Sequence, residues 1–363
     1  MKNITLLFIV SSLEKGGAGK MVHWVTRVLA KEYSSVYAIA IDKEEQSITN
    51  EAVHYLPPLD EHKGGLFGFY KTIKAIRKTI LAIKPDIVVS FVSDVAVCAR
   101  LATLGIRHLI VVSAERGDPF TLRPMWRKLV SWAYRHSDFC IFQLPDARDF
   151  FGKSVLNKSF IIPNAAFINA PKIGMHRARK KTIVSVGRFV WEKGYEYLIE
   201  AFSNLKEKHP DYQLILYGSG PFLDLYKKQV EKLGLNKDVI FPGYTYDIAD
   251  ALKDEGIFVL PSRYEGIPNA LIEALLVGIP TISSDCTPGG PRFLTNDGRH
   301  GSIVPVGNVE CLTDAMNQLI EDTALYQKYE HLGPTIADVL SPSKIEKLWL
   351  DAFETITIGL EKC

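Results

Sequence analysis

The stretch Phe258-Val-Leu-Pro-Ser-Arg-Tyr-Glu265-Gly-Ile-Pro-Asn-Ala-Leu-Ile-Glu273 predicts a short apolar strand, a tight loop and the start of a helix. The apolar helical pattern continues through Val277 and stops at Gly278, with a proline two residues further on, as helix ends commonly do. Strand, loop and helix in this order are typical of α/β folds. The loop carries Glu265, and Glu273 falls about one turn inside the helix.

The same stretch predicts a site for a phosphate flanked by sugars. Unpaired N–H groups at a helix start and the positive end of the helix dipole favour an anion, and Gly266 lets the backbone approach it. The two carboxylates suit hydroxyl donors, such as those of a ribose or a hexose, and not phosphate oxygens. A nucleotide diphosphate sugar offers both kinds of group. For this stretch alone, the alternative is two solvated carboxylates on an ordinary strand and helix.

A second motif, Gly187-Arg-Phe-Val-Trp-Glu-Lys193-Gly, lies upstream of the first. Together the two motifs resemble the signatures, E-x7-E among them, of the family-4 retaining glycosyltransferases of the large group 1 family. That family has the GT-B fold, so the resemblance implies an α/β protein with two facing, Rossmann-like doubly wound domains and a cleft between them. Further segments that resemble the family follow in order at 16–19, 162–164, 217–221, 241–243 and 341–349.

Strand-like runs alternate with helical periodicity along the chain, which is typical of parallel sheets with crossover helices. At 363 residues the chain is larger than one hydrophobic core usually serves. Residues 163–171 and the basic stretch up to 181 have the composition of a linker. We expect strands at 4–10, 36–41, 86–91, 109–113, 139–144 and 160–162, and again at 183–186, 213–217, 239–241, 256–260, 281–284 and 302–306.

The resemblance gives each part of the chain a task. It implies an N-terminal acceptor-binding domain over 1–170 and a C-terminal nucleotide-sugar-binding domain over 171–340. A closing helix over 341–363 would cross back to the N-terminal domain.

Three charged residues receive catalytic roles from the resemblance. Arg188 and Lys193 would hold the donor diphosphate, because positive charge stabilises the departing nucleoside diphosphate. Glu265 would lie beside the donor sugar, bind its hydroxyls and stabilise positive charge at the anomeric carbon. The alternative for Lys193 is a solvated charge at the start of a helix.

The resemblance also implies the substrate-binding positions. Glu273 would bind the ribose hydroxyls, and Gly16 and Gly17 would let backbone approach the donor β-phosphate and the acceptor. The positions that would lie along the phosphate and sugar are Gly266, Ile267, Pro268 and Asn269. Those that would lie near the base are Gly218, Gly243 and Tyr244.

One segment departs from the family pattern. Many relatives have a histidine after the fourth strand of the first domain, where this chain has Ser113-Ala-Glu-Arg-Gly-Asp-Pro119. We expect Glu115 or Arg116 to take over work on the acceptor side, with Asp118 as a partner. A structural ion pair between Glu115 and a basic residue is an equal alternative.

Neither a metal nor a cofactor is expected. The chain has no Asp-x-Asp pair of the kind used by metal-dependent glycosyltransferases, and the resemblance implies metal-independent transfer with retention. The cysteines are odd in number and form no CxxC pair, so neither a disulfide framework nor a zinc site is indicated. They are Cys98, Cys140, Cys286, Cys311 and Cys363.

Hydropathy favours a cytoplasmic protein. No apolar run reaches the roughly 18 residues that a membrane span needs. The apolar stretch within residues 1–10 is near the lower length limit of a signal peptide, and no small-residue cleavage site follows it. We expect this stretch to be the first buried strand.

Charge is divided unevenly along the chain. Residues 1–180 carry 26 basic and 15 acidic side chains, a net of +11, and the remainder carries 17 and 26, a net of −9. Basic and aromatic residues interleave at 66–78 and 120–135, which suits an anionic membrane surface or a polyprenyl diphosphate acceptor. Nucleic acid is not expected, because no binding motif accompanies the charge.

For residues 66–78 we favour a structural alternative, in which an apolar stripe faces the core and a basic back faces solvent. The stripe consists of Leu66, Phe69, Ile73, Ile76, Ile80 and Ile83.

Two other functions are alternatives to a glycosyltransferase. Lys15-Gly-Gly-Ala-Gly-Lys20 is nearly the phosphate loop of the ParA and MinD ATPases, but Met21 and Val22 stand where a P-loop needs a hydroxyl for Mg²⁺. A GT-B nucleotide-sugar epimerase is the alternative within the fold, although it is not expected to carry E-x7-E. Intact charged residues in both motifs argue against a non-catalytic homologue.

We therefore expect a cytoplasmic enzyme, peripheral on the inner face of the plasma membrane. It would move a hexose or N-acetylhexosamine from a nucleotide donor, with UDP favoured, to a lipid-linked glycan acceptor. The expected setting is cell-surface polysaccharide or glycolipid biosynthesis, such as that of lipopolysaccharide or capsule.

Overall fold

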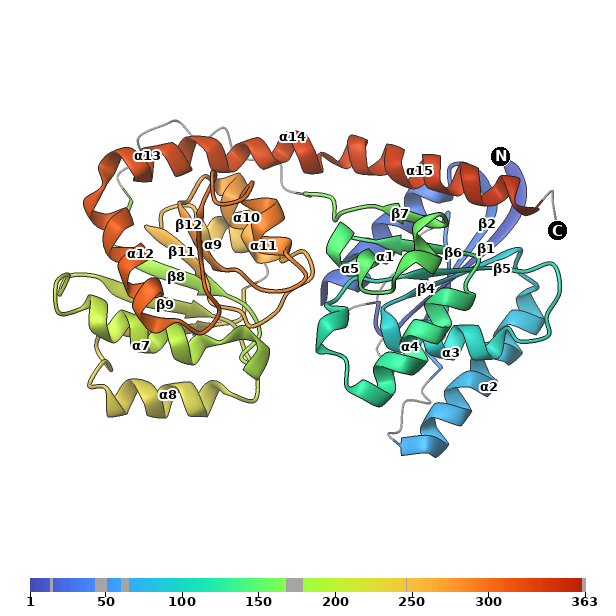
Figure 1. Ribbon diagram of the computed structural model, residues 1–363, viewed down its shortest axis with the longest axis horizontal. Helices are drawn as coiled ribbons and strands as arrows, with labels where there is room; N and C mark the ends of the chain where they lie inside the picture. Colours follow the sequence, from blue (N-terminus) through green and yellow to red (C-terminus); the bar gives the residue numbers. More distant parts are fainter. Residues whose placement is uncertain (14–15, 43–50, 60–64, 168–178, 246, 361–363) are drawn as a thin grey trace. The chain divides into compact units, whose positions relative to one another are not determined.

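The computed structural model describes the chain except for residues 14–15, 43–50, 60–64, 168–178, 246 and 361–363. The chain folds into two compact α/β units (Figure 1). The first unit comprises Met1–Ala165 and Pro342–Cys363, and the second comprises Ala166–Ser341.

The described part of the first unit contains a parallel sheet in the order β3-β2-β1-β4-β5-β6-β7. Its central strands are buried along their length, because helices cover both faces. The strands are β1 (Lys2–Val10), β2 (Tyr33–Ala40), β3 (His54–Leu56), β4 (Ile87–Phe91), β5 (Ile110–Ala114), β6 (Phe139–Phe142) and β7 (Ser159–Ile161). The helices are α1 (Gly16–Leu29), α2 (Gly65–Ile83), α3 (Ser93–Ala102), α4 (Pro124–His136), α5 (Pro145–Asp149), α6 (Lys153–Leu156) and α15 (Pro342–Ile358).

The C-terminal helix α15 packs on the first unit through aromatic side chains. Trp349 stacks on Phe91 with ring centroids 6.1 Å apart, and Phe353 stacks on Phe8 at 6.2 Å. Both α15 side chains are fully buried. Burial of two large aromatic groups explains why the end of the chain returns to the unit in which the chain begins.

The described part of the second unit contains a parallel sheet in the order β10-β9-β8-β11-β12-β13. Helix α7 packs with α8 and with α12, and α10 packs with α9 and α11. The strands are β8 (Thr182–Val186), β9 (Gln213–Tyr217), β10 (Val239–Gly243), β11 (Ile257–Leu260), β12 (Thr281–Ser284) and β13 (Ser302–Val304). The helices are α7 (Tyr195–Leu205), α8 (Leu223–Lys232), α9 (Ile248–Leu252), α10 (Asn269–Val277), α11 (Gly290–Leu294), α12 (Val309–Glu321), α13 (Thr323–Leu332) and α14 (Ile336–Leu340).

The predicted fold class is confirmed, because each unit is a doubly wound parallel α/β sheet. Two local predictions are corrected. The edge strand β3 was not expected from the sequence. In the predicted core stripe of α2, Ile76 and Ile80 are buried, but Leu66 is 89% exposed because the first turns of the helix extend past the sheet core.

Candidate active site

The two sequence motifs meet at the switch point of the second sheet. Strand order runs outward in one direction from β8 and in the other from β11, which is its neighbour. In doubly wound sheets, ligands bind outside the carboxyl ends of the strands at such a point. The loop after β8 carries residues 187–193, and the loop after β11 carries residues 261–268.

Lys193 and Glu265 form an ion pair across this switch point. The Lys193 Nζ lies 2.5 Å from Glu265 Oε1, and the Ser262 hydroxyl donates to the same oxygen at 2.7 Å. The two charged side chains are 19% and 11% exposed, so the pair is partly desolvated but still within reach of a ligand.

Backbone contact fixes the two loops against each other. Lys193 ends the short helix η2 (Trp191–Lys193), and Gly194 follows it with a left-handed φ of 61°. A Cβ at Gly194 would lie 2.4 Å from the carbonyl oxygen of Pro261, in the loop after β11. Glycine is therefore required where the first loop crosses the second.

The N-terminus of α10 lies beside Glu265, because the helix follows β11. The N–H of Glu265 donates to the carbonyl of Thr287 at 3.1 Å and holds the loop in place. Glu273 lies in the second turn of α10 and is partly exposed. Four positions were expected to line the phosphate and sugar. Ile267 and Pro268 are buried, and Gly266 and Asn269 are partly exposed.

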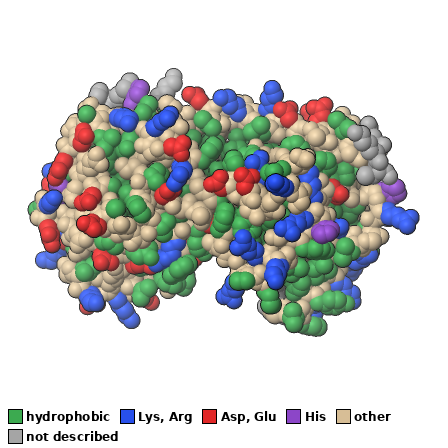
Figure 2. Space-filling view, in the orientation of Figure 1, with side chains coloured by type: hydrophobic (Ala, Val, Ile, Leu, Met, Phe, Trp, Pro, Cys, Tyr) green, Lys and Arg blue, Asp and Glu red, His purple; other side chains and the backbone are tan. Residues whose placement is uncertain are grey.

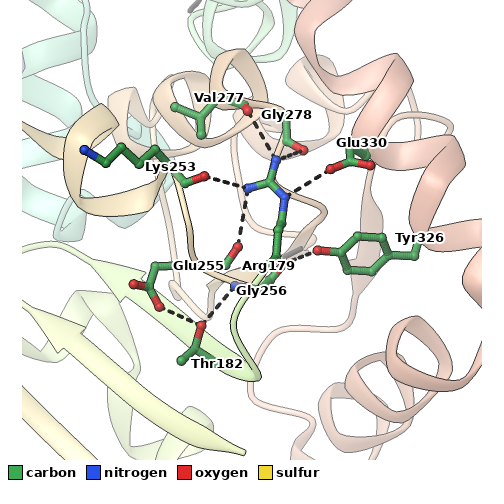
Figure 3. A network of polar contacts seen from close by, with 9 residues as sticks. All are labelled: Arg179, Thr182, Lys253, Glu255, Gly256, Val277, Gly278, Tyr326 and Glu330. Atoms are coloured by element: carbon green, nitrogen blue, oxygen red, sulfur yellow. Dashed lines mark hydrogen bonds and ion pairs between the residues drawn. The ribbon is translucent and has the colours of Figure 1, made fainter. Parts of the chain in front are cut away.

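Arg179 holds the opposite end of α10 (Figure 3). Its guanidinium donates to the carbonyls of Val277 at 3.4 Å and Gly278 at 2.9 Å, and it pairs with Glu330 at 3.1 Å. The Arg179 and Glu330 side chains are only 4% and 14% exposed. A cation at a helix C-terminus satisfies the last carbonyls and opposes the dipole. Sequence reasoning missed this residue, because it lies in the stretch that was assigned to the linker.

Arg263 is a second residue that the sequence did not single out. It donates to the Trp191 carbonyl at 2.5 Å and to the Tyr197 hydroxyl at 2.8 Å, and it pairs with Glu196. Its guanidinium also lies over the Trp191 ring, 4.4 Å from the centroid. Arg263 therefore ties η2 to the loop that carries Glu265. Its position two residues before Glu265 was the only signal for it.

Comparison with known proteins shows which enzymes the second half of the chain resembles. Residues 168–335 match the family model described as glycosyl transferases group 1. This chain is a glycosyltransferase. Its sequence is 24% identical over 352 residues to an uncharacterized glycosyltransferase of Haemophilus influenzae, with 94% of this chain and 97% of that protein covered. It is 32% identical over 151 residues to the lipopolysaccharide core biosynthesis glycosyltransferase LpsE of Rhizobium meliloti, with 42% and 43% covered.

Solved structures with the same fold support the architecture of this glycosyltransferase. Sucrose-phosphate synthase from Thermosynechococcus elongatus has a TM-score of 0.84 at 16% identity, with 98% of this chain and 100% of that chain covered. Anabaena HepE, solved in complex with UDP, has a TM-score of 0.77 at 17% identity, with 97% and 100% covered.

The remaining second-unit positions of the glycosyltransferase lie at the same edge of the sheet. Arg188 follows β8, pairs with Glu192 at 3.4 Å and is 74% exposed. Gly218 follows β9, and a Cβ there would lie 1.9 Å from the Gly187 carbonyl oxygen, so the loops after β8 and β9 touch. Gly243 ends β10, and Tyr244 beside it is 65% exposed.

In the first unit of the glycosyltransferase, Gly16 and Gly17 begin α1, the helix that follows β1 in the chain. They lie at the switch point of the first sheet, between β1 and β4. The glycine-rich segment is therefore the first turn of a helix and not a separate turn. Lys15, on which the ATPase alternative partly rests, lies outside the described residues.

Glu115 follows β5 and is buried, with 3% of its surface exposed. Its carboxylate accepts hydrogen bonds from the N–H groups of Arg116 at 3.0 Å and Gly117 at 2.9 Å, from the Tyr134 hydroxyl at 3.0 Å, and from the Ser93 hydroxyl. These four donors are neutral groups. They therefore do not form the ion pair between Glu115 and a basic residue that the sequence left as an alternative. Burial raises the pKa of Glu115, and the hydrogen bonds partly oppose this.

Arg116 lies between aromatic rings of the first unit. Its guanidinium is 5.3 Å from the Phe91 centroid and 5.1 Å from that of Trp349, and it donates to the Ile162 carbonyl at 2.9 Å. Burial lowers the pKa of Arg116 to about 10. Asp118 accepts from the N–H of Phe120 at 2.9 Å and caps the helix η1 (Pro119–Thr121).

Two kinds of feature are absent from the described part of the glycosyltransferase. No group of three or more His, Cys, Asp and Glu side chains there is placed to hold a metal ion. No helix among the same residues is long and apolar enough to cross a membrane.

Proposed function

We propose that this glycosyltransferase moves a hexose or N-acetylhexosamine from a nucleotide diphosphate sugar to a glycan acceptor. Transfer proceeds with retention of anomeric configuration and needs neither a metal ion nor another cofactor. The proposal rests on one observation, the Lys193–Glu265 ion pair at the switch point of the second sheet, beside the start of α10.

The proposed reaction exchanges one bond at the anomeric carbon for another. The bond to the β-phosphate oxygen breaks, and its electron pair leaves with the nucleoside diphosphate. A bond to the acceptor hydroxyl oxygen forms, and the departing diphosphate oxygen takes the proton of that hydroxyl. Lys193 and the exposed Arg188 are the cations available to stabilise the departing diphosphate.

We expect Lys193 and Glu265 to exchange each other for donor groups when the donor binds. A donor phosphate takes the Lys193 ammonium, and Glu265 then accepts hydrogen bonds from donor-sugar hydroxyls. Glu273 accepts from the ribose hydroxyls in the same way. The N-terminus of α10 adds positive potential for the diphosphate.

A UDP-sugar is the favoured donor, and a cell-surface polysaccharide or glycolipid is the favoured product. The first preference draws on HepE, which was solved with UDP, and the second on LpsE, which is named for lipopolysaccharide core biosynthesis. A lipid-linked acceptor and a peripheral position on the inner face of the plasma membrane complete the proposal. They draw on the net charge of +11 in residues 1–180.

The test is nucleotide release and binding across a panel of UDP-, GDP- and ADP-sugars plus ATP, with and without EDTA. We expect one sugar nucleotide to bind saturably and equally in EDTA, and product analysis by NMR to show the donor's anomeric configuration. Loss of activity in EDTA would contradict the metal-free reaction. Magnesium-dependent ATP hydrolysis with no response to any sugar nucleotide would contradict the transferase.

A further inference from the structure

The beginning of α2 exposes large apolar side chains that no described residue of the first unit covers. Leu66, Phe67 and Tyr70 are 89%, 72% and 61% exposed. The rest of the helix is anchored in the core through Ile76 and Ile80. The first turns of α2 therefore present an apolar surface to solvent.

The start of α4 extends the same surface. Phe69 of α2 packs edge-on against Trp126 of α4 with ring centroids 5.7 Å apart, so the two helix starts are neighbours. The Trp126 indole N–H donates to Asp94 at 2.6 Å, which fixes the ring. Met125, next to this ring, is 86% exposed.

The charge on these two helices has a single sign. Neither α2 nor α4 contains an acidic residue. The ammonium of Lys71 lies over the ring of the exposed Phe67, 4.8 Å from its centroid. Figure 2 shows hydrophobic side chains gathered at the lower right, where α2 lies in Figure 1, with Lys and Arg side chains around them. The basic residues of the two helices are Lys71, Lys74, Arg77, Lys78, Arg127, Lys128 and Arg135.

We propose that this surface docks the protein on an anionic bilayer. The docking surface consists of Leu66, Phe67, Tyr70 and Met125 with the basic side chains of α2 and α4. Its apolar tip enters the boundary between headgroups and acyl chains, and the lysines and arginines lie at the lipid phosphates. The inference deepens the proposed function, because a lipid-linked acceptor would be presented at such a surface.

Charge and shape favour a bilayer over the other occupants. In a symmetric dimer formed through this surface, like charges would face one another, which is unfavourable. An open hollow of about 700 Å³ beside α2 is lined by Lys71, Lys74 and Lys78 together with apolar residues such as Leu56 and Leu59. Lipid phosphates can therefore approach these lysines from the side as well as from the tip of the helix.

The test is flotation of the full chain with vesicles of phosphatidylcholine, alone or mixed with phosphatidylglycerol. We expect binding to the mixed vesicles only, weakened by rising salt. Substituting Leu66→Ser with Phe67→Ser, or Lys74→Glu with Lys78→Glu, should lower the partition coefficient roughly tenfold or more. All four positions are exposed to solvent. Unchanged unfolding temperatures would verify that each variant folds.

Matched controls lie on the second unit. Leu225→Ser with Val339→Ser changes apolar side chains that are 53% and 50% exposed, and Lys227→Glu with Lys228→Glu reverses two exposed lysines of α8. Both controls should bind the mixed vesicles as the wild type does. The proposal is overturned if the wild type ignores the mixed vesicles or if the α2 variants bind as well as the controls do. It is also overturned if the α2 variants convert a dimer into a monomer without affecting vesicle binding. None of these outcomes bears on donor binding, which is measured without lipid.

Discussion

The two sheets share one winding pattern but carry different chemistry at their carboxyl ends. In the second unit, Lys193 and Glu265 from two loops form an ion pair that is partly exposed, at 19% and 11%. In the first unit, Glu115 is 3% exposed, and Ser93, which follows β4, is one of four neutral groups that donate to it. The winding fixes where polar loop residues gather, and their partners determine whether a ligand can compete for them.

The free energy needed to separate the partners also differs between the two sites. Both side chains of the Lys193–Glu265 pair keep some contact with solvent, and a donor phosphate would give the ammonium a new anionic partner, so the phosphate can displace Glu265 from Lys193. A buried carboxyl with several donors is costly to disturb, at about 1–3 kcal/mol for each unsatisfied group. We therefore propose that the reactive chemistry lies in the second unit, and an acceptor role for Glu115 or Arg116 stays a prediction.

Removing the Lys193 ammonium should have the largest effect on activity. Lys193→Ala should lower the turnover number by about 100-fold or more, because the departing diphosphate loses its partly buried cation. Steady-state nucleotide release measures this. The control is Lys206→Ala, which removes a lysine of similar exposure (15%) that pairs with Asp238 at 2.7 Å. Equal losses in both variants would show that damage to the fold, and not lost catalysis, causes the effect.

Removing the Arg179 contacts at the end of α10 should lower the stability of the second unit. Arg179→Ala leaves Glu330 and the carbonyls at the end of α10 without their cation, so the free energy of unfolding should fall by about 3 kcal/mol. Denaturant unfolding followed by tryptophan fluorescence measures this. Lys181→Ala, which breaks a pair with 66% and 52% exposed side chains, should change the free energy of unfolding far less. If Arg179→Ala costs no more than this control, the anchoring role is wrong.

A smaller effect is expected for donor affinity at the second turn of α10. Glu273→Ala should weaken nucleotide binding roughly tenfold, because the ribose hydroxyls lose a charged acceptor. Calorimetric titration measures the change, with Glu200→Ala on an exposed position of α7 as the control. Unchanged affinity in Glu273→Ala would remove this residue from the donor site.

The smallest effect concerns the pH dependence of the first unit. Burial raises the pKa of Glu115 above the ordinary value of 4.5, so its contribution to stability is complete below 4.5 and is lost as pH rises through the raised pKa. Glu115→Gln cannot ionise, and the hydroxyls of Ser93 and Tyr134 can rotate to accept from its amide. The wild type should therefore lose stability relative to Glu115→Gln as pH rises toward neutral, which unfolding temperatures over a pH series would show. Parallel pH profiles for the two proteins would contradict the raised pKa.

Local sequence patterns predicted the features of the second site that depend on neighbouring residues. The apolar runs located β8 and β11, and the Gly-x-Pro-Asn turn located the start of α10. Once the winding of the sheet is known, the loops after β8 and β11 must meet, so Lys193 and Glu265 could be expected near each other. Their direct contact depends on side-chain positions that spacing does not give.

The features that were missed depend on contacts between distant segments. β3 lacks an apolar run and forms by pairing His54 to Leu56 with Tyr37 to Ile39 of β2. Arg179 reaches Glu330, which is 151 positions away in sequence. Leu66 matched the helical stripe, but the core that the stripe packs on ends before its first turn. In each case the residue type can be read from the sequence, whereas its partner is known only once the chain is folded.

The most direct test of the contrast between the two sites is calorimetric titration of UDP, GDP and ADP in EDTA. The proteins compared are the wild type, Lys193→Ala and Glu115→Gln. We predict that one nucleotide binds the wild type saturably, binds Lys193→Ala at least about tenfold more weakly, and binds Glu115→Gln with unchanged affinity. Equal binding to the wild type and Lys193→Ala, with the loss confined to Glu115→Gln, would contradict a donor site at the second switch point.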